Sequence, residues 1–300
     1  VYAVKEKTLK DYFISSGILV VVAALAIAPS LGKTLTTYEY SKDTMRGGSV
    51  LQKNTEGEKN SSGLDIDYAF EWSYGKAETM TLLIPNFHGG GSGYDIGENS
   101  EFYRTLKKLG QGNQQAMQMS KHAPMYWGDQ RFTEGPPYAG AIVCFLFILG
   151  LIIVKGPEKW WLLGATVLSF VMSWGRNFEV VNNFLFYHLP IYNKFRVPSM
   201  ALVMAEVTMA ALAVLALKEI FNQQDNRKIF LKPLYISAGI NGGLCLLFAL
   251  FGGGLMSFTG YIDTQLQGSY PAELMAAIVS DRKSMLASDS WRSLIFIALA

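Results

Sequence analysis

Carboxylates and aromatic side chains alternate over a short stretch of the sequence, from Asp65 to Gly75. Aromatic ring faces stack on the C–H faces of sugars, and carboxylates accept hydrogen bonds from sugar hydroxyls. This pairing predicts a sugar-binding surface in which Trp72 and Tyr74 supply the rings. A second interpretation is open, in which the same rings pack the stretch against a membrane interface, where Trp and Tyr are enriched. The carboxylates available here are Asp65, Asp67 and Glu71.

A histidine followed by a glycine-rich run, His88 to Gly93, comes next along the chain. Glycine allows positive φ angles and close approach of the backbone to another group. The run lacks the Lys-Ser/Thr pair of a P-loop and does not lie between a strand and a helix, so it does not predict a nucleotide site. We expect a turn at the rim of a cavity, with His88 as a substrate-binding candidate.

Cations bracket a short connection that contains Pro190. These cations are expected at the outer membrane surface, although Lys and Arg usually gather on the cytoplasmic side. Their position therefore needs an explanation. One reason is binding of an anionic group such as a lipid-linked phosphate; the other is ordinary contact with lipid headgroups. The residues concerned are Arg176 with its neighbour Asn177, Lys194 and Arg196.

Glu206 lies inside an apolar run, in the sequence Met-Ala-Glu-Val. A carboxylate in hydrocarbon costs about 2.5 kcal/mol or more, so it should face other helices or a wet cavity. A functional role and a structural one, in which a protonated or paired Glu206 joins two helices, are both open.

These residues are positioned by long apolar segments. The 300 residues are 50% hydrophobic and 17% charged, and the mean hydropathy is +0.19. About 20 apolar residues cross about 30 Å of hydrocarbon, and backbone in lipid must be helical. The sequence therefore predicts a mainly α polytopic bundle of about six spans. They are Tyr12–Leu31, Tyr138–Val154, Trp160–Trp174, Pro198–Leu217, Leu234–Met256 and a sixth beginning at Ser293.

Lysine and arginine gather in alternate connections, which places these in the cytoplasm. The long segment from residue 33 to 136 carries more acidic than basic residues and is expected outside, as a loop domain of mixed or irregular structure. Within it, Ser100 to Leu109 predicts a short amphipathic helix that Gly110 stops. The expected organisation is a lead-in with the first span (1–32), the loop domain (33–136), a four-span bundle (137–256), an outer amphipathic segment (257–290) and a truncated sixth span (291–300).

Some classes of chemistry are disfavoured. The net charge of +2 gives no electrostatic case for nucleic-acid binding. Cys144 and Cys245 both fall in apolar runs, so neither a disulfide nor a cysteine metal site is expected. No cofactor is firmly implied, and the need for a divalent metal is left open. Because the chain starts at Val1 and stops inside an apolar run at Ala300, we expect an internal piece of a longer protein.

Several segments resemble the bacterial YfhO membrane-protein family, in the form seen in Bacteroidetes. They are distributed along nearly the whole chain, and the stretch from Tyr192 to Ser199 is the most distinctive. The others are Asp67–Tyr68, Trp72–Gly75, Leu83–Phe87, Gly89–Gly90, Gly135–Ala141, Trp174–Phe178, Asp281–Met285 and Arg292–Ser293.

The resemblance implies a GT-C-type glycosyltransferase of the bacterial inner (cytoplasmic) membrane. Such enzymes transfer a sugar from a polyprenyl-phosphate carrier, here to a cell-envelope polymer, on the outer face. They usually carry the catalytic carboxylate after the first span, in a region that would precede Val1. The catalytic base is therefore unknown, and Asp65, Asp67 and Glu71 are fallback candidates. The substrate-binding candidates are Trp72, Tyr74, His88, Arg176, Asn177, Lys194, Arg196 and Glu206.

Two other functions are also considered. A transporter or flippase of lipid-linked material would make Glu206 central and would predict internal repeats, which the sequence does not show clearly. A non-catalytic envelope assembly protein would use the outer loop as a docking surface.

Overall fold

The computed structural model describes residues 8–44, 63–222 and 228–300. The chain forms two compact units, Val1–Asp65 and Ile66–Ala300, which are described separately. The described residues are mainly helical and contain no strand; their one bridge pairs Tyr94 with Ala123.

The first unit is one long apolar helix. Within residues 8–44, the helix runs through α2 (Leu9–Ile27), a 3-10 turn (Ala28–Ser30) and α3 (Leu31–Ser41), and these three elements bury no residue. The first span was expected to end at Leu31, but the helix continues to Ser41. Residues 45–62 of the expected loop lie outside the described residues.

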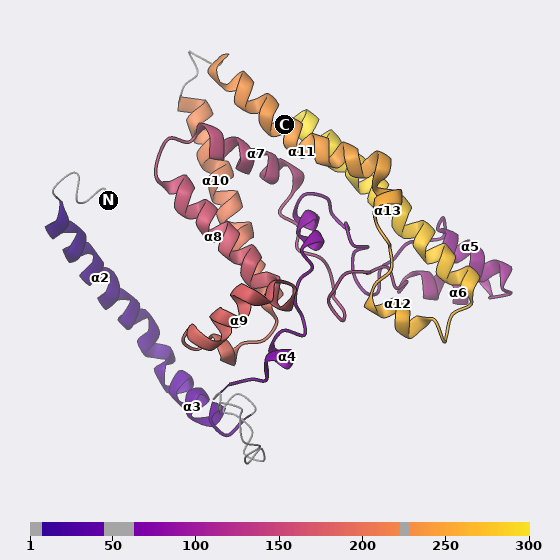
Figure 1. Cartoon of the computed structure of the whole chain (residues 1–300), viewed down its shortest axis with the longest axis horizontal. Helices are drawn as coiled ribbons and strands as arrows, with labels where there is room; N and C mark the ends of the chain where they lie inside the picture. Colours follow the sequence, from indigo (N-terminus) through magenta and orange to yellow (C-terminus); the bar gives the residue numbers. More distant parts are fainter. Residues whose placement is uncertain (1–7, 45–62, 223–227) are drawn as a thin grey trace. The chain divides into compact units, whose positions relative to one another are not determined.

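The second unit is built on five helices (Figure 1). α10 packs against α7 and α8, and α11 packs against α13 and α7. Small and apolar side chains fill these contacts, as at Gly150, where a Cβ would lie 2.9 Å from Leu212. Their bounds are α7 (Ala141–Ile153), α8 (Glu158–Ser173), α10 (Leu202–Asn222), α11 (Lys228–Leu255) and α13 (Ala272–Leu299).

Three helices of the described residues are long and apolar enough to cross a membrane: Leu9–Ser41, Pro198–Asn222 and Lys228–Leu255. The expected second span forms α7, a shorter apolar helix, and the expected third forms the 16-residue α8. The outer amphipathic segment (257–290) and the start of the sixth span were expected as separate elements, but residues 272–290 of the first and the start of the second form one 28-residue helix, α13. Its first half faces the loop domain, which explains its mixed polarity.

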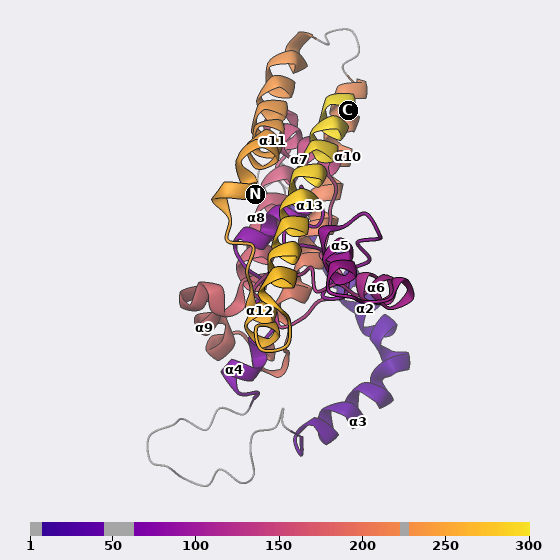
Figure 2. The ribbon, with the colours of Figure 1, turned by 90° about the vertical axis from the view of Figure 1, so that its right-hand side faces the viewer.

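The part of the loop domain in the second unit is held by short helices (Figure 2). The predicted helix at Ser100 is α5; the Ser100 side chain caps it by accepting from Tyr103 N, and Gly110 ends it at φ +87°. Asp281 of α13 accepts the N–H groups of Glu101 and Phe102 at 2.9 and 2.8 Å. The remaining elements are α4 (Ile66–Ala69), α6 (Asn113–Ser120), α9 (Glu179–His188), α12 (Tyr261–Leu266) and 3-10 turns at Ala77–Leu82, Gly175–Phe178, Tyr192–Lys194 and Pro198–Ala201.

Apolar residues of the loop domain enter the core of the bundle. Leu82, Leu83 and Ile84 are buried in one cluster with residues of α7, α10, α11 and α13. Their backbone carbonyls are satisfied by bundle side chains, since Cys144 Sγ donates to Leu82 O at 3.3 Å and Ser293 Oγ donates to Leu83 O at 3.0 Å. The segment that contains Leu82, Leu83 and Ile84 therefore belongs to the same compact unit as these helices.

Candidate functional site

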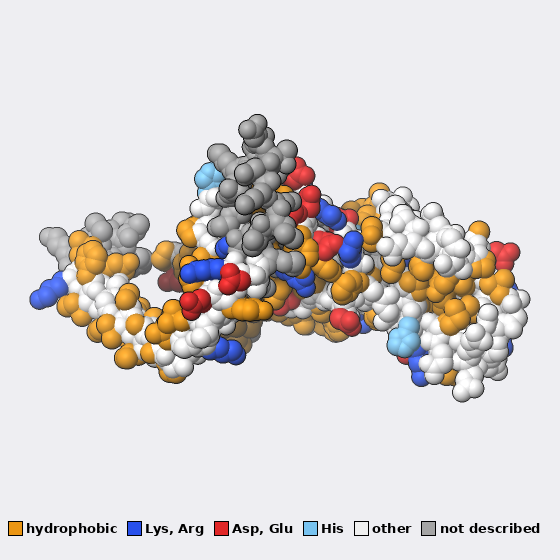
Figure 3. Space-filling model, turned by 90° about the horizontal axis from the view of Figure 1, so that it is seen from below, with side chains coloured by type: hydrophobic (Ala, Val, Ile, Leu, Met, Phe, Trp, Pro, Cys, Tyr) orange, Lys and Arg blue, Asp and Glu red, His pale blue; other side chains and the backbone are white. Residues whose placement is uncertain are grey.

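A pocket of about 380 Å³ lies where the loop domain meets the end of α8. Its lining carries both signs of charge, and Figure 3 shows acidic and basic side chains side by side in the middle of one face. Because charged groups line a hollow, the pocket suits a polar ligand that has hydroxyls and a negative group. The lining residues are Asp67, Tyr68, Glu71, Asp129, Arg131, Arg176 and Tyr261.

The backbone between α8 and α9 fixes one side of the pocket. Tyr74 N donates to Ser173 O at 2.8 Å, and Arg176 N donates to Ser73 Oγ at 2.9 Å. Gly175 makes the turn at φ +44°, and a Cβ there would lie 2.1 Å from Ser73 Oγ. Close packing at this glycine therefore holds the start of the 3-10 turn, and with it Arg176, against the Ser73 segment.

The charges in the pocket are partly paired. Arg131 Nη1 lies 2.7 Å from Glu71 Oε1. Asn177 Nδ2 donates to Asp129 Oδ2 at 3.1 Å, whereas Arg176 Nη2 makes a long 3.5 Å contact with Asp129 O. Arg176 is exposed and lines the pocket, and a planar guanidinium matches phosphate or carboxylate.

An aromatic wall adjoins the pocket. The Arg196 guanidinium lies 5.5 Å from the ring centroids of both Tyr68 and Trp72, and it donates to the Tyr68 hydroxyl. Trp72 also meets Phe132 edge to face at 5.4 Å. Cation–π contacts hold a ring in a fixed orientation, so Arg196 positions Tyr68 at the pocket wall.

A buried carboxylate, Glu78, lies behind the pocket. It is 2% exposed and accepts from Tyr126 Oη, at 3.1 and 3.0 Å to its two oxygens, and from Asp129 N. Burial raises the pKa of Glu78 to about 7, and the charge of Asp129 adds to this. A Cβ on Gly75 would lie 2.9 Å from Glu78 Oε1 and 2.8 Å from Asp129 Oδ2, so both carboxyls approach one glycine.

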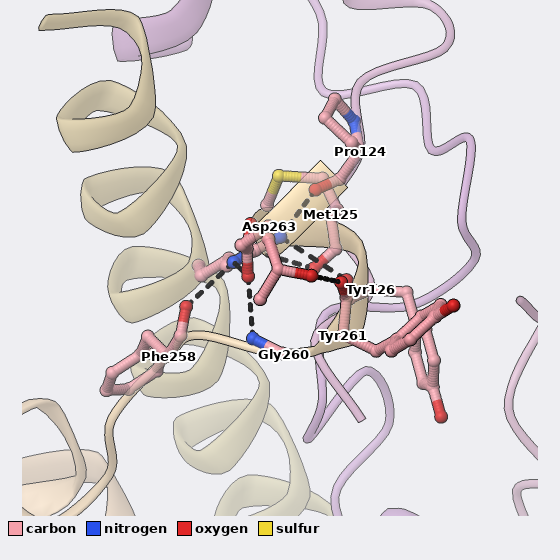
Figure 4. Close-up of polar contacts among 9 residues, drawn as sticks. Pro124, Met125, Tyr126, Phe258, Gly260, Tyr261 and Asp263 are labelled. Carbon is pink, nitrogen blue, oxygen red and sulfur yellow. Dashed lines mark hydrogen bonds and ion pairs between the residues drawn. The ribbon is translucent and has the colours of Figure 1, made fainter. Parts of the chain in front are cut away.

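A second buried network holds the segment that brings Tyr261 to the pocket (Figure 4). Arg282 of α13 donates to the carbonyls of Pro124, Met125 and Phe258 and to Asp263 Oδ2. Asp263 Oδ2 also accepts Gly260 N at 2.6 Å. Three distant parts of the sequence are therefore joined through one guanidinium.

The structure brings together many of the predicted site residues. Asp67, Glu71 and Arg176 line the pocket, Asn177 and Arg196 contact its lining, and Trp72 contacts Arg196. Tyr74 lies beneath it, with its buried hydroxyl donating to Glu78 O at 2.9 Å. Burial raises the pKa of Tyr74, and the charges of Glu78 and Glu206 add to this.

The other predicted residues are placed elsewhere. His88 is buried with its ring 4.1 Å from that of Trp127, and burial lowers its pKa to about 3, so it is neutral in the fold. Asp65 ends the first unit, Lys194 lies in the 3-10 turn after α9, and Glu206 is half-buried in α10. His88, expected as a substrate-binding residue, therefore packs in the interior.

Five residues of the site were not predicted as site residues: Tyr68, Glu78, Asp129, Arg131 and Tyr261. Residues Trp127 to Arg131 have the same mixture of aromatic, glycine and charged residues as Asp65 to Gly75. This local composition could have identified Asp129 and Arg131 as site candidates. Glu78 carried no signal, because its burial depends on tertiary packing.

Among the described residues, no group of three or more His, Cys, Asp and Glu is arranged to hold a metal ion. The chain matches no protein-family model, no curated protein and no solved structure in the three comparisons made.

Proposed function

We propose that the chain is a membrane glycosyltransferase-like protein of the GT-C type, which moves a sugar from a polyprenyl-phosphate carrier to a cell-envelope acceptor. The proposal combines the resemblance to the YfhO family with the geometry of the pocket. It places the protein in a bacterial cytoplasmic membrane as a multi-pass chain, with residues 33–136 on the outer face. Three apolar helices of sufficient length support this setting.

In this proposal the chain crosses the membrane about six times. α7 and α8 are shorter than an average span, but a bundle accommodates shorter helices by local thinning of the bilayer. Their partners α10 and α11 are long enough to cross. The pocket then lies at the outer end of α8 and α10, at the level where a lipid carrier presents its phosphate.

One observation carries the proposal: a guanidinium with available donors, on Arg176, shares a pocket with three carboxylates and two tyrosines. The guanidinium suits the carrier phosphate, and the carboxylates and phenols suit sugar hydroxyls. In the reaction, an acceptor hydroxyl attacks the anomeric carbon, the bond from that carbon to the carrier phosphate oxygen breaks, and the hydroxyl proton passes to a carboxylate. Asp67 and Glu71 are the candidates for that role predicted from the sequence, and Asp129 joins them from the structure.

A binding measurement tests the phosphate site. The full chain in lipid nanodiscs is titrated with a fluorescent polyprenyl phosphate and with the matching polyprenol, which lacks the phosphate. Arg176→Gln should weaken phosphate binding about tenfold or more, since a charge-assisted bond contributes about 1.5–3 kcal/mol, and should leave polyprenol binding unchanged. Arg104→Gln, at an exposed position on α5, is the matched control. Equal affinities for wild type and Arg176→Gln would overturn the phosphate assignment.

Transfer is then tested with a labelled polyprenyl-phosphate sugar and envelope polymer. Asp67→Asn, Glu71→Gln and Asp129→Asn are compared one by one, and loss of transfer with retained phosphate binding identifies the base. Binding without transfer in the wild type would instead favour a non-catalytic envelope assembly protein.

A transporter of lipid-linked material is the second candidate function, and Glu206 favours it. This carboxylate is half-buried within a helix that is able to cross a membrane. If Glu206→Gln abolishes translocation of a labelled lipid-linked sugar and leaves transfer intact, transport is the function.

A further inference from the structure

Helix α9 presents an apolar face to its surroundings. Residues three and four apart share a side of a helix, and on one side of α9 these are Val180, Phe184 and Tyr187. Their exposed fractions are 82%, 60% and 60%. The face is therefore unpartnered within the chain as described.

The opposite side of α9 is docked on the protein. Phe186 is 2% exposed and meets Phe70 edge to face at 5.5 Å. Asn182 is fully buried, and its Nδ2 donates to Val171 O at 2.7 Å and to Phe178 O at 3.1 Å. A helix beside water carries polar residues outward and apolar residues inward, whereas α9 has a buried amide and an outward aromatic surface.

The apolar face continues along the chain toward a helix that is able to cross a membrane. Ile191 and Phe195 follow α9 and are 68% and 67% exposed. Pro198–Asn222 then begins, and its outward side chains Val203 and Val207 are 60% and 64% exposed. Because few residues separate α9 from that helix, α9 lies at the level of its first turns. Figures 1 and 2 show α9 at the lower end of α8 and α10.

Polar and cationic groups accompany this apolar surface. His188 stacks on Phe184, with ring centroids 4.5 Å apart, and Lys194 and Arg196 follow in the next turns. Aromatic rings with nearby cations suit the boundary between acyl chains and phosphate headgroups. Lys194 and Arg196 are therefore placed to meet the anionic phosphates of a lipid leaflet.

We infer that Val180, Phe184, Tyr187, Ile191 and Phe195, the α9 surface, lie in the headgroup–acyl boundary of one membrane leaflet, with lipid as the occupant. The inference does not depend on sugar transfer. It gives the pocket a lipid-facing border, because Arg196, which contacts Tyr68 of the pocket, directly follows Phe195 of this surface.

Spin labels on single cysteines test the inference in nanodiscs that contain phosphatidylglycerol. Val180→Cys and Phe184→Cys are labelled in the full chain, while both native cysteines are buried and serve as the unlabelled background. Val207→Cys on α10 marks lipid, and Gln114→Cys on α6 marks water. Oxygen should increase the spin relaxation rate of the two α9 labels severalfold more than a water-soluble nickel chelate does. The membrane depth calculated from the two rates should lie between the depths of the two reference labels.

Each other outcome overturns the inference. If the nickel chelate reaches the α9 labels as readily as Gln114→Cys, the surface faces water. If neither reagent reaches them, protein covers the surface, either another copy of the chain or a different partner. Tyr187→Cys provides a third label on the same face, so a single poorly folded variant does not decide the result.

Discussion

Arg282 Nη1 lies 2.8 Å from Asp263 Oδ2, and the two side chains are 0% and 3% exposed. A buried ion pair is costly to desolvate unless hydrogen bonds satisfy its remaining polar atoms. Here the guanidinium also bonds to the carbonyls of Pro124, Met125, Tyr126 and Phe258. The pair thus connects α13 to the two segments that precede Asp129 and contain Tyr261, both of which line the pocket.

Arg282→Met should destabilise the protein strongly. It removes the charge, leaves Asp263 buried without its counter-charge, and deprives several carbonyls of their donors. Loss of one partner of a buried pair costs about 3–5 kcal/mol. Thermal unfolding in detergent micelles, followed by tryptophan fluorescence, should show a large fall in Tm.

A matched pair at the surface provides the control. Arg104 Nη1 lies 2.7 Å from Glu101 Oε1, but the two side chains are 57% and 45% exposed. Arg104→Met should change stability by less than about 1 kcal/mol. Similar Tm shifts for the two variants would show that burial of the Arg282 pair does not determine its contribution to stability.

Glu78 should make stability depend on pH. Its pKa is about 7 in the fold and 4.5 in the unfolded chain, where the carboxyl is exposed to water. Between these values the folded state keeps a proton that the unfolded state releases, so stability falls as pH rises from 4.5 to 7. The shift corresponds to about 3 kcal/mol. Unfolding free energies measured by urea across this range should show the fall in wild type and a flatter profile in Glu78→Gln.

Glu101→Gln is the control for that profile, because the Glu101 side chain is 45% exposed. It should retain the wild-type slope. If Glu78→Gln also retains the slope, another group causes the pH dependence, and Glu78 is ionised in the fold at neutral pH.

The sequence predicted elements better than it predicted contacts. Apolar runs located the helices, and Ser100 with Gly110 located both ends of α5, because caps and stops are local signals. The first helix continued past Leu31, since the polar turns from Lys33 to Ser41 are compatible with helix. The continuity of α13 depends on its contact with the loop domain, which periodicity does not show.

The sequence indicated some of the residues that line the pocket and missed others. Asp67, Glu71 and Arg176 were identified because charge beside aromatics and charge at a membrane surface are unusual in sequence. Arg282 appeared in a distinctive segment, but its role depends on carbonyls more than 150 positions earlier. His88 was expected as a substrate-binding residue, yet the fold buries its ring against that of Trp127.

Gly89→Ala should be among the most damaging small substitutions. Gly89 has φ +90°, and a Cβ there would lie 1.8 Å from Met125 O, a backbone atom that is unable to rotate away. Strained φ and a backbone clash together should cost on the order of 3 kcal/mol or more. Gly97→Ala is the control, since Gly97 has φ +68° with open space around it, and a left-handed alanine costs about 1–2 kcal/mol.

The same carbonyl links this glycine to Arg282, because Met125 O accepts Arg282 Nε at 3.0 Å. An alanine at Gly89 would displace that acceptor, so Gly89→Ala and Arg282→Met remove a shared interaction. Their combined effect on the free energy of unfolding should be smaller than the sum of the single effects. Additive effects in this double-mutant cycle would show that the backbone at Met125 absorbs the methyl group without disturbing the Arg282 network.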